Sequence, residues 1–125
     1  MSIRQEALRW FSSNYQIVDE AIYCSKYYMP TESWNRQALW WFEIPLKAIE
    51  IDSEANLHLI CEMAPGNNEF HYLSIPKKYI SDHLDKLYVR KELVSIYISA
   101  EPEKMFVEQR GTGELGFEIF KQIKK

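Results

Sequence analysis

Two β-rich segments joined by a short turn restrict the fold of this chain more than any other feature. Residues 56–64 and 69–75 are dominated by apolar and aromatic side chains, and residues 65–68 between them read Pro-Gly-Asn-Asn. This arrangement is typical of a β-hairpin. Because both sides of the two segments are largely apolar, we expect the hairpin to lie in the middle of a sheet.

The loop length also predicts a register for this hairpin. A loop of four residues places Cys61 opposite Tyr72 on one side of the hairpin and Glu62 opposite His71 on the other. Oppositely charged residues that face each other across two strands form ion pairs. We therefore expect a cross-strand ion pair between Glu62 and His71.

Helical periodicity appears in three places. Residues 2–13 carry apolar side chains at a spacing of four, and a second stripe follows Pro76, over residues 79–87. Thr112 is a suitable cap for a third helix, whose apolar stripe consists of Leu115, Ile119 and Ile123. The sequence thus predicts an N-terminal helix, a mid-chain helix and a C-terminal helix.

Strand-like composition occupies most of the remaining chain. Residues 16–28 are aromatic and β-branched, and residues 93–99 alternate with a period of two. Residues 105–110 suggest a short strand. Residues 38–51 fit both a helical and a strand pattern, but Pro45 opposes a helix, so we expect a strand that is bent or bulged at Pro45.

These elements define a fold class. Several strands in succession with few crossover helices are typical of an α+β protein. We expect a single globular domain over residues 1–125, with a mainly antiparallel sheet of five to six strands. The chain length suits one domain of this kind.

Charge and apolar pattern restrict the environment of the chain. The net charge of -3 argues against a protein that coats nucleic acid through many cations. The longest purely apolar run, residues 38–42, is far shorter than the ~20 residues of a membrane helix. The N-terminus has no apolar segment typical of a signal peptide, so we expect a cytoplasmic protein with no membrane contact. Cys24 and Cys61 are then expected to be free thiols.

Residues 111–116 match the pattern Gly-x-Gly-x-x-Gly. A dinucleotide site of this type needs a following strand and an acidic residue ~20 positions further on, and the chain is too short to supply them. The glycines are better explained by a tight turn. A second hypothesis remains open, in which Arg110, Thr112 and Gly113 hold one phosphate or carboxylate at the start of the last helix.

Side chains suited to metal binding or catalysis are scattered. His58 and Cys61 point to opposite faces of one strand, so they cannot share a metal ion. Residues 101–104 (Glu-Pro-Glu-Lys) combine carboxylates with a lysine, as in some nucleases, but equally describe a charged turn. We expect neither a metal site nor a cofactor, and the sequence identifies no catalytic residue.

Aromatic residues make up 14% of the chain, and three of the 4 tryptophans are Trp34, Trp40 and Trp41. Neighbouring residues of a strand face opposite sides, so Trp40 and Trp41 separate two faces of the sheet. Trp34 and Arg36 lie in a polar connection, where we expect an exposed recognition surface. The alternative, in which Trp34 folds back into the core, remains open.

Three functional hypotheses follow. The first is a non-catalytic binding or protein-interaction module whose aromatic surface includes Trp34, Arg36 and Trp41, because tryptophan, tyrosine and arginine dominate binding hot spots. Its partner is another protein or a second copy of the chain. The first alternative is a small metal-dependent nuclease or hydrolase. The second is a nucleic-acid-binding accessory protein that uses Trp34, Arg36, Arg90, Lys91 and Arg110.

Overall fold

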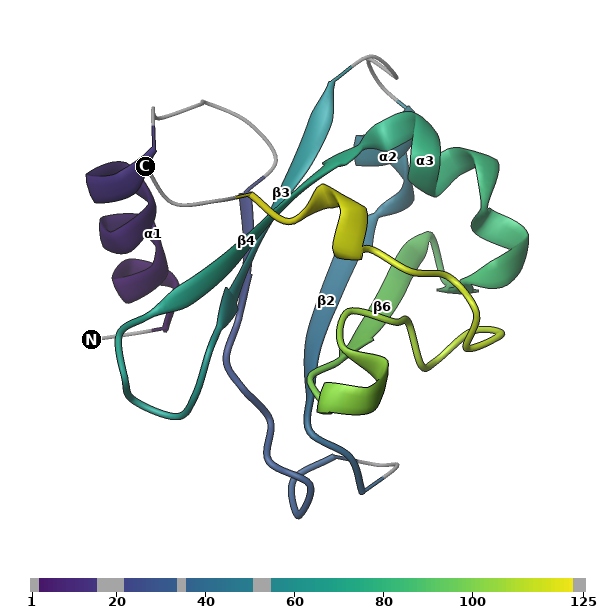
Figure 1. Cartoon of the computed structure of the whole chain (residues 1–125). Coiled ribbons are helices and arrows are strands. Elements are labelled where there is room, and N and C mark those ends of the chain that lie inside the picture. The colour runs from purple at the N-terminus through teal and green to yellow at the C-terminus, as the bar shows by residue number, and fades with distance from the viewer. Residues whose placement is uncertain (1–2, 16–21, 34–35, 51–54, 123–125) are drawn as a thin grey trace.

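The computed structural model describes residues 3–15, 22–33, 36–50 and 55–122, and it has the α+β architecture that the sequence predicts (Figure 1). The described helices are α1 (Ile3–Asn14), α2 (Leu46–Glu50) and α3 (Lys77–Asp82). The described strands are β1 (Ile22–Ser25), β2 (Leu39–Pro45), β3 (Asn56–Glu62), β4 (Phe70–Pro76), β5 (Tyr88–Arg90) and β6 (Leu93–Ser99). Short 3-10 turns occur at Leu84–Lys86, Pro102–Lys104 and Glu118–Phe120.

The strands form two three-stranded sheets rather than the expected single one. One sheet has the order β1–β3–β4 and the other β2–β6–β5. All paired strands are antiparallel except β1 and β3, which run parallel. The expectation of a mainly antiparallel sheet is therefore only partly confirmed. The physical reason is that β2 and α2 lie between β1 and β3 in the chain, and such a long connection allows a parallel pair.

The main core lies between the two sheets. Trp40 of β2 is 1% exposed, stacks on Phe106 at a ring-centroid distance of 5.5 Å, and donates a hydrogen bond of 2.7 Å from Nε1 to the Glu62 carbonyl oxygen. This single side chain therefore contacts the C-terminal third of the chain and the end of β3. Alternate residues of β2, β3, β4 and β6 complete the same apolar cluster.

Helix α1 covers the outer face of the β1–β3–β4 sheet (Figure 1). Ala7 and Phe11, four residues apart on one side of α1, are buried against Ile60, Phe70 and Tyr72. The predicted N-terminal helix is thus confirmed, and its apolar stripe is the buried face. This second cluster leaves the β1–β3–β4 sheet covered on both sides.

The hairpin is confirmed, but its predicted register is wrong by one residue. Cys61 pairs with His71, and Glu62 pairs with Phe70. The slip moves the His71 ring into the main core, on the opposite face from the Glu62 side chain. The expected ion pair therefore does not form. The Glu62 carboxylate instead accepts hydrogen bonds from the Tyr27 and Gly66 backbone N–H groups, at 2.9 and 3.1 Å.

Two other predictions on strands need correction. The strand expected over residues 38–51 ends at Pro45, where helix α2 begins. The strand expected over residues 105–110 consists of isolated bridges, such as that between Ile98 and Glu108. In residues 16–28, only β1 is a described strand, and residues 16–21 lie outside the described part of the chain.

The predicted C-terminal helix is wrong. Residues 111–117 form no regular helix, and Ile119, assigned to its buried stripe, is 81% exposed. Long-range backbone bonds take the place of helical ones, since the Phe117 N–H donates to the Phe106 carbonyl and the Glu108 N–H donates to the Leu115 carbonyl. The mid-chain helix is confirmed as α3, although the α-helix ends at Asp82.

The two adjacent tryptophans of β2 should respond differently to truncation. We expect Trp40→Ala to lower the free energy of unfolding by about 3–5 kcal/mol, because it empties a packed core site. Trp41 is 37% exposed, so Trp41→Ala should lower the free energy of unfolding by only about 1 kcal/mol, mainly because the ring contacts are lost. Urea denaturation of both variants checks this contrast. Equal losses of unfolding free energy would contradict the placement of Trp40 in the core and Trp41 on the outer face of the sheet.

The pH dependence of stability should carry a contribution from His71. Burial lowers the pKa of His71 to about 4, and the charge of Lys121 adds to this effect. Below the ordinary histidine pKa of about 6.5, this histidine is protonated in the unfolded chain but stays neutral in the folded chain. The free energy of unfolding therefore decreases as the pH falls from about 6.5 to about 4. We expect His71→Phe to remove this component. Identical pH profiles for the variant and the wild type, measured by urea denaturation, would show that His71 plays no part.

Candidate functional site

The outer face of the β2–β6–β5 sheet is only partly covered by the described residues, since Trp41 and Glu43 are exposed whereas Tyr88, Ser95 and Tyr97 are half-buried. The side chains of Trp41 and Glu43 on β2, Ser95 and Tyr97 on β6, and Tyr88 on β5 occupy this face. The alternation of the strands puts these residues outside because their neighbours fill the core. The arrangement differs from the other sheet, whose outer face is covered by α1.

Aromatic side chains form a row across this face. The Trp41 and Tyr97 rings face each other across the strand pair, with centroids 5.5 Å apart and an interplanar angle of 17°. Tyr28 lies beside Trp41 at 6.2 Å. Burial raises the pKa of Tyr97, while the charge of Arg110 opposes that rise. The row is thus partly desolvated, with Trp41 as its most exposed ring.

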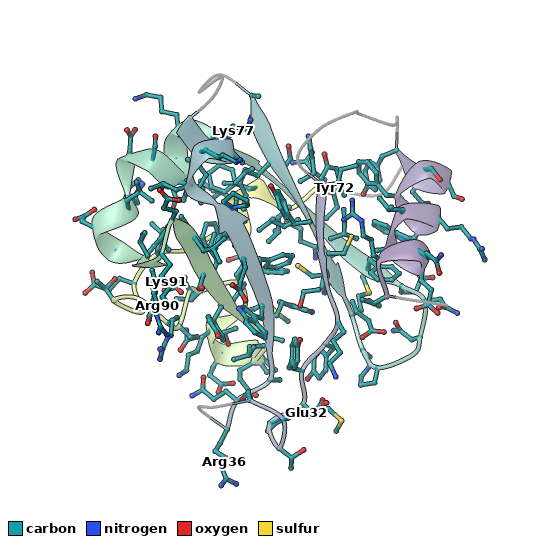
Figure 2. The ribbon with its side chains drawn as sticks, turned by 180° about the vertical axis from the view of Figure 1, so that it is seen from behind. Glu32, Arg36, Tyr72, Lys77, Arg90 and Lys91 are labelled. Carbon is teal, nitrogen blue, oxygen red and sulfur yellow. The ribbon has the colours of Figure 1, made fainter. Side chains whose placement is uncertain are left out.

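Three cations border the aromatic row on the β5 side. The Arg110 guanidinium lies over the Tyr88 ring, 4.3 Å from its centroid, in a cation–π contact. Arg90 and Lys91 are exposed and lie next to each other at the end of β5 (Figure 2). Within the described residues, neither of their side chains has an ion-pair or hydrogen-bond partner. Their charges therefore face solvent.

These residues enclose a groove of about 390 Å³. We call it the aromatic–basic groove and define it by Trp41, Tyr88, Tyr97, Arg90, Lys91 and Arg110. Glu43, Leu93 and Ser95 complete its lining. A larger hollow of about 450 Å³ lies against α1, but its lining has no net charge, because it contains one cation, Arg9, and one carboxylate, Glu6. The aromatic–basic groove is the better candidate because it combines exposed rings with an excess of positive charge.

The turn between β5 and β6 has an unusual backbone. Lys91 and Glu92 have positive φ angles of 51° and 65°, as the two central residues of a type I′ turn require. Asn-Gly is the favoured pair for this turn, so Lys-Glu carries strain. The Glu92 carbonyl accepts the Leu46 N–H at the start of α2, which explains why the turn is held. As a result, Lys91 is fixed at the end of the groove.

A buried carboxylate positions Arg110. Glu108 is 0% exposed, and its two oxygens accept hydrogen bonds of 2.9 and 2.7 Å from the Arg110 and Gly111 backbone N–H groups. Burial raises the pKa of Glu108, and these backbone donors act against the rise. The carboxylate therefore works as a turn-forming group. It keeps the start of the 110–113 loop close to β6, where Arg110 reaches Tyr88.

The structure brings together only some of the residues named from the sequence. Trp41 and Arg110 share the groove, together with Arg90 and Lys91. Thr112 and Gly113 are exposed but do not line it. Arg36 is also exposed and lies on a loop well away from Arg90 and Lys91 (Figure 2).

The other residues named from the sequence have different outcomes. Trp34 lies outside the described residues, so the expectation about its exposure stays a prediction. Thr112 caps no helix, because no helix follows it, and its N–H donates to the Lys86 carbonyl oxygen at 3.1 Å. The hypothesis that Thr112 and Gly113 bind an anion at the start of a helix therefore lacks the helix that it requires.

Sequence reasoning missed Tyr88, Tyr97 and Glu43 as members of the site. The three-residue strand β5 is too short to show periodicity, and its turn contains no glycine or asparagine. The period-two pattern of residues 93–99 could have placed Tyr97 on the outer face, together with positions 93, 95 and 99. Only the register of β6 against β2 shows that Tyr97 faces Trp41.

The residues considered for catalysis have structural contacts. One oxygen of the Glu101 carboxylate accepts the Ala38 N–H at 2.7 Å, and residues 101–104 form the predicted turn. Cys24 and Cys61 are free thiols that belong to different apolar clusters. Among the described residues, no group of three or more histidine, cysteine, aspartate or glutamate side chains is close enough to hold a metal ion.

Comparisons with known proteins add no assignment. Neither the family models, nor the curated proteins, nor the solved structures contain a match to this chain. The helices in the described ranges are all too short or too polar to span a bilayer. The groove geometry is therefore the basis for a functional proposal.

The 110–113 loop should be sensitive to a methyl group at Gly111. A Cβ atom there would collide with the Lys86 carbonyl oxygen and lie 2.8 Å from the Leu87 Cα. We expect Gly111→Ala to lower the free energy of unfolding by about 1–3 kcal/mol, since backbone must move. Gly116→Ala is the matched control, because no atom lies within 4 Å of its Cβ position. Chemical denaturation separates the two, and a Gly111→Ala variant as stable as the wild type would refute this close approach.

Proposed function

We propose that this chain is a non-catalytic binding module and that the aromatic–basic groove is its binding surface. The observation that carries the proposal is the exposure of Trp41 on a sheet face that is only partly covered, beside three cations. An exposed indole next to arginines and tyrosines is the composition of an interface hot spot. A groove on regular strands also needs little rearrangement to bind.

The contrast between the two sheets supports this proposal. Helix α1 buries the outer face of one sheet, whereas the outer face of the other keeps Trp41, Tyr88 and Tyr97 partly exposed. Aromatic surface in contact with water has an unfavourable free energy, which a bound partner would remove. The sequence alone favours a protein or a second copy as that partner, and the cations of the groove add a preference for an anionic one.

A titration monitored by NMR tests the proposal. The ¹⁵N-labelled chain is titrated with three probes, namely a cytidine octanucleotide, an octaglutamate peptide, and the unlabelled chain itself. We expect at least one probe to shift the Trp41 indole signal and the amide signals of β2, β5 and β6. At the same concentration, this probe should shift the remaining signals of Trp41→Ala less than those of the wild type, while the melting temperature stays within a few degrees of the wild type.

Two outcomes would overturn the proposal. In one, none of the three probes shifts the signals of the β2–β6–β5 sheet. In the other, a probe shifts only signals of α1 or of the hollow that contains Arg9 and Trp10. Ile119→Ala is the control for the loss of an exposed apolar side chain, because Ile119 is 81% exposed and lies outside the groove.

A further inference from the structure

We propose that the aromatic–basic groove binds single-stranded nucleic acid, an inference that rests on the proposed function and names its ligand. Single strands expose both bases, which stack on aromatic rings, and phosphates, which pair with lysine and arginine. The groove offers both kinds of partner on one face. Its local charge is positive, although the net charge of the whole chain is -3.

The aromatic part of the groove suits exposed bases. Trp41 is 37% exposed, and its ring already stacks with Tyr97 at 5.5 Å, so the pair has the planar geometry that a base extends. Arg110 over Tyr88 adds a guanidinium plane to the same face. Arginine planes and aromatic rings are the two side-chain surfaces on which unpaired bases stack. A double helix keeps its bases stacked inside, so it would leave these rings without a partner.

The basic part of the groove suits a chain of phosphates. Arg90 and Lys91 are exposed without an ion-pair partner among the described residues, whereas Lys26 and Lys78 are paired with Glu32 and Asp82. The strained turn holds Lys91 at the groove end. The turn fixes the position of the Lys91 backbone, so its ammonium group stays within reach of a phosphate in the groove.

The groove continues beyond the aromatic row. A second hollow of about 320 Å³ shares Lys91 and Leu93 with it and extends to Pro45 and Lys47. The two hollows therefore adjoin at the β5–β6 turn. Lys47 is exposed and adds a fourth cation along this path, although the exposed Glu92 places one carboxylate in the same hollow. An elongated surface with cations in succession fits a polymer better than a compact small molecule.

The same features disfavour a second copy of the chain. A two-fold pair of these faces would bring six cations together with only two carboxylates, those of Glu43. Like charges placed opposite each other are destabilising. An acidic peptide satisfies the cations but supplies no planar group for each aromatic ring. Glu43 suits a nucleic acid as well, because a carboxylate accepts a hydrogen bond from the amino group of cytosine.

Fluorescence anisotropy with labelled cytidine octanucleotides, one of RNA and one of DNA, tests the inference. We expect at least one of them to bind the wild-type chain. Trp41→Ala should weaken this binding about tenfold, as the loss of one stacking platform does, while Trp41→Phe should retain most of it. The logarithm of the binding constant should fall with the logarithm of salt concentration with a slope of about -2.8, set by Arg90, Lys91, Arg110 and Lys47.

Matched variants distinguish the effect of the groove cations on binding from the effect of the net charge of the chain. Arg90→Ala/Lys91→Ala should reduce the magnitude of the salt slope to about 1.4, because Arg110 and Lys47 remain. Arg9→Ala/Lys78→Ala removes the same charge from exposed positions on α1 and α3. It should leave the affinity within about twofold, because exposed charges more than about 10 Å away are largely screened at about 0.1 M salt. Circular dichroism confirms that each variant is folded.

The outcomes distinguish this inference from the proposed function. Failure of both octanucleotides to bind, equal binding of a duplex, or equal losses in the two double variants would overturn the assignment of nucleic acid. If octaglutamate or a second copy binds the groove and the octanucleotides do not, the binding module stands and this ligand is wrong. If no probe binds the groove, both proposals are wrong.

Discussion

The indole of Trp40 is the contact on which the arrangement of the two sheets depends. It is buried between them, stacks on Phe106, and donates its N–H to the Glu62 carbonyl at the end of β3. A buried indole N–H needs such an acceptor, so the distance between β2 and β3 is fixed by a hydrogen bond as well as by packing. Once Trp40 points inward, the strand period obliges Trp41 to point outward. The exposed ring of the groove is therefore a direct consequence of the core.

Buried or half-buried carboxylates take over the hydrogen-bonding role that aspartate, asparagine and serine side chains play in many turns. Glu62, Glu101 and Glu108 each accept backbone N–H groups from loop residues. The chain contains only 4 glycines, and an ionised carboxylate is a strong acceptor for unpaired backbone donors. This use of glutamate explains why the sequence misleads at these positions. A glutamate beside a histidine or a lysine resembles an ion pair or a catalytic acid, but in this fold its partners are main-chain groups, which leave no trace in a residue pattern.

Elements that depend on local periodicity were predictable, and elements that depend on distant contacts were not. Helix α1, the hairpin and β6 have strong apolar patterns, and the structure contains all three. The apolar residues near the C-terminus also have a helical spacing, but Phe117 bonds to Phe106 and packs in the main core, so tertiary contacts override the spacing. In the candidate site, Trp41, Arg90, Lys91 and Arg110 could be named from residue type. Their proximity could not, because β5 has only three residues and its turn lacks the usual signals.

The cations of the groove also act against association of two unbound chains through this face. An open sheet face with tyrosines and a tryptophan invites association with another sheet. Arg110 covers one face of Tyr88, which replaces apolar surface by a hydrated guanidinium, and Arg90 and Lys91 add charges that repel an identical face. These same side chains supply the electrostatic attraction for an anionic partner. In the binding module that we propose, a single set of cations would therefore act against self-association and favour a ligand of opposite charge, so the aromatic row and its basic border would work together.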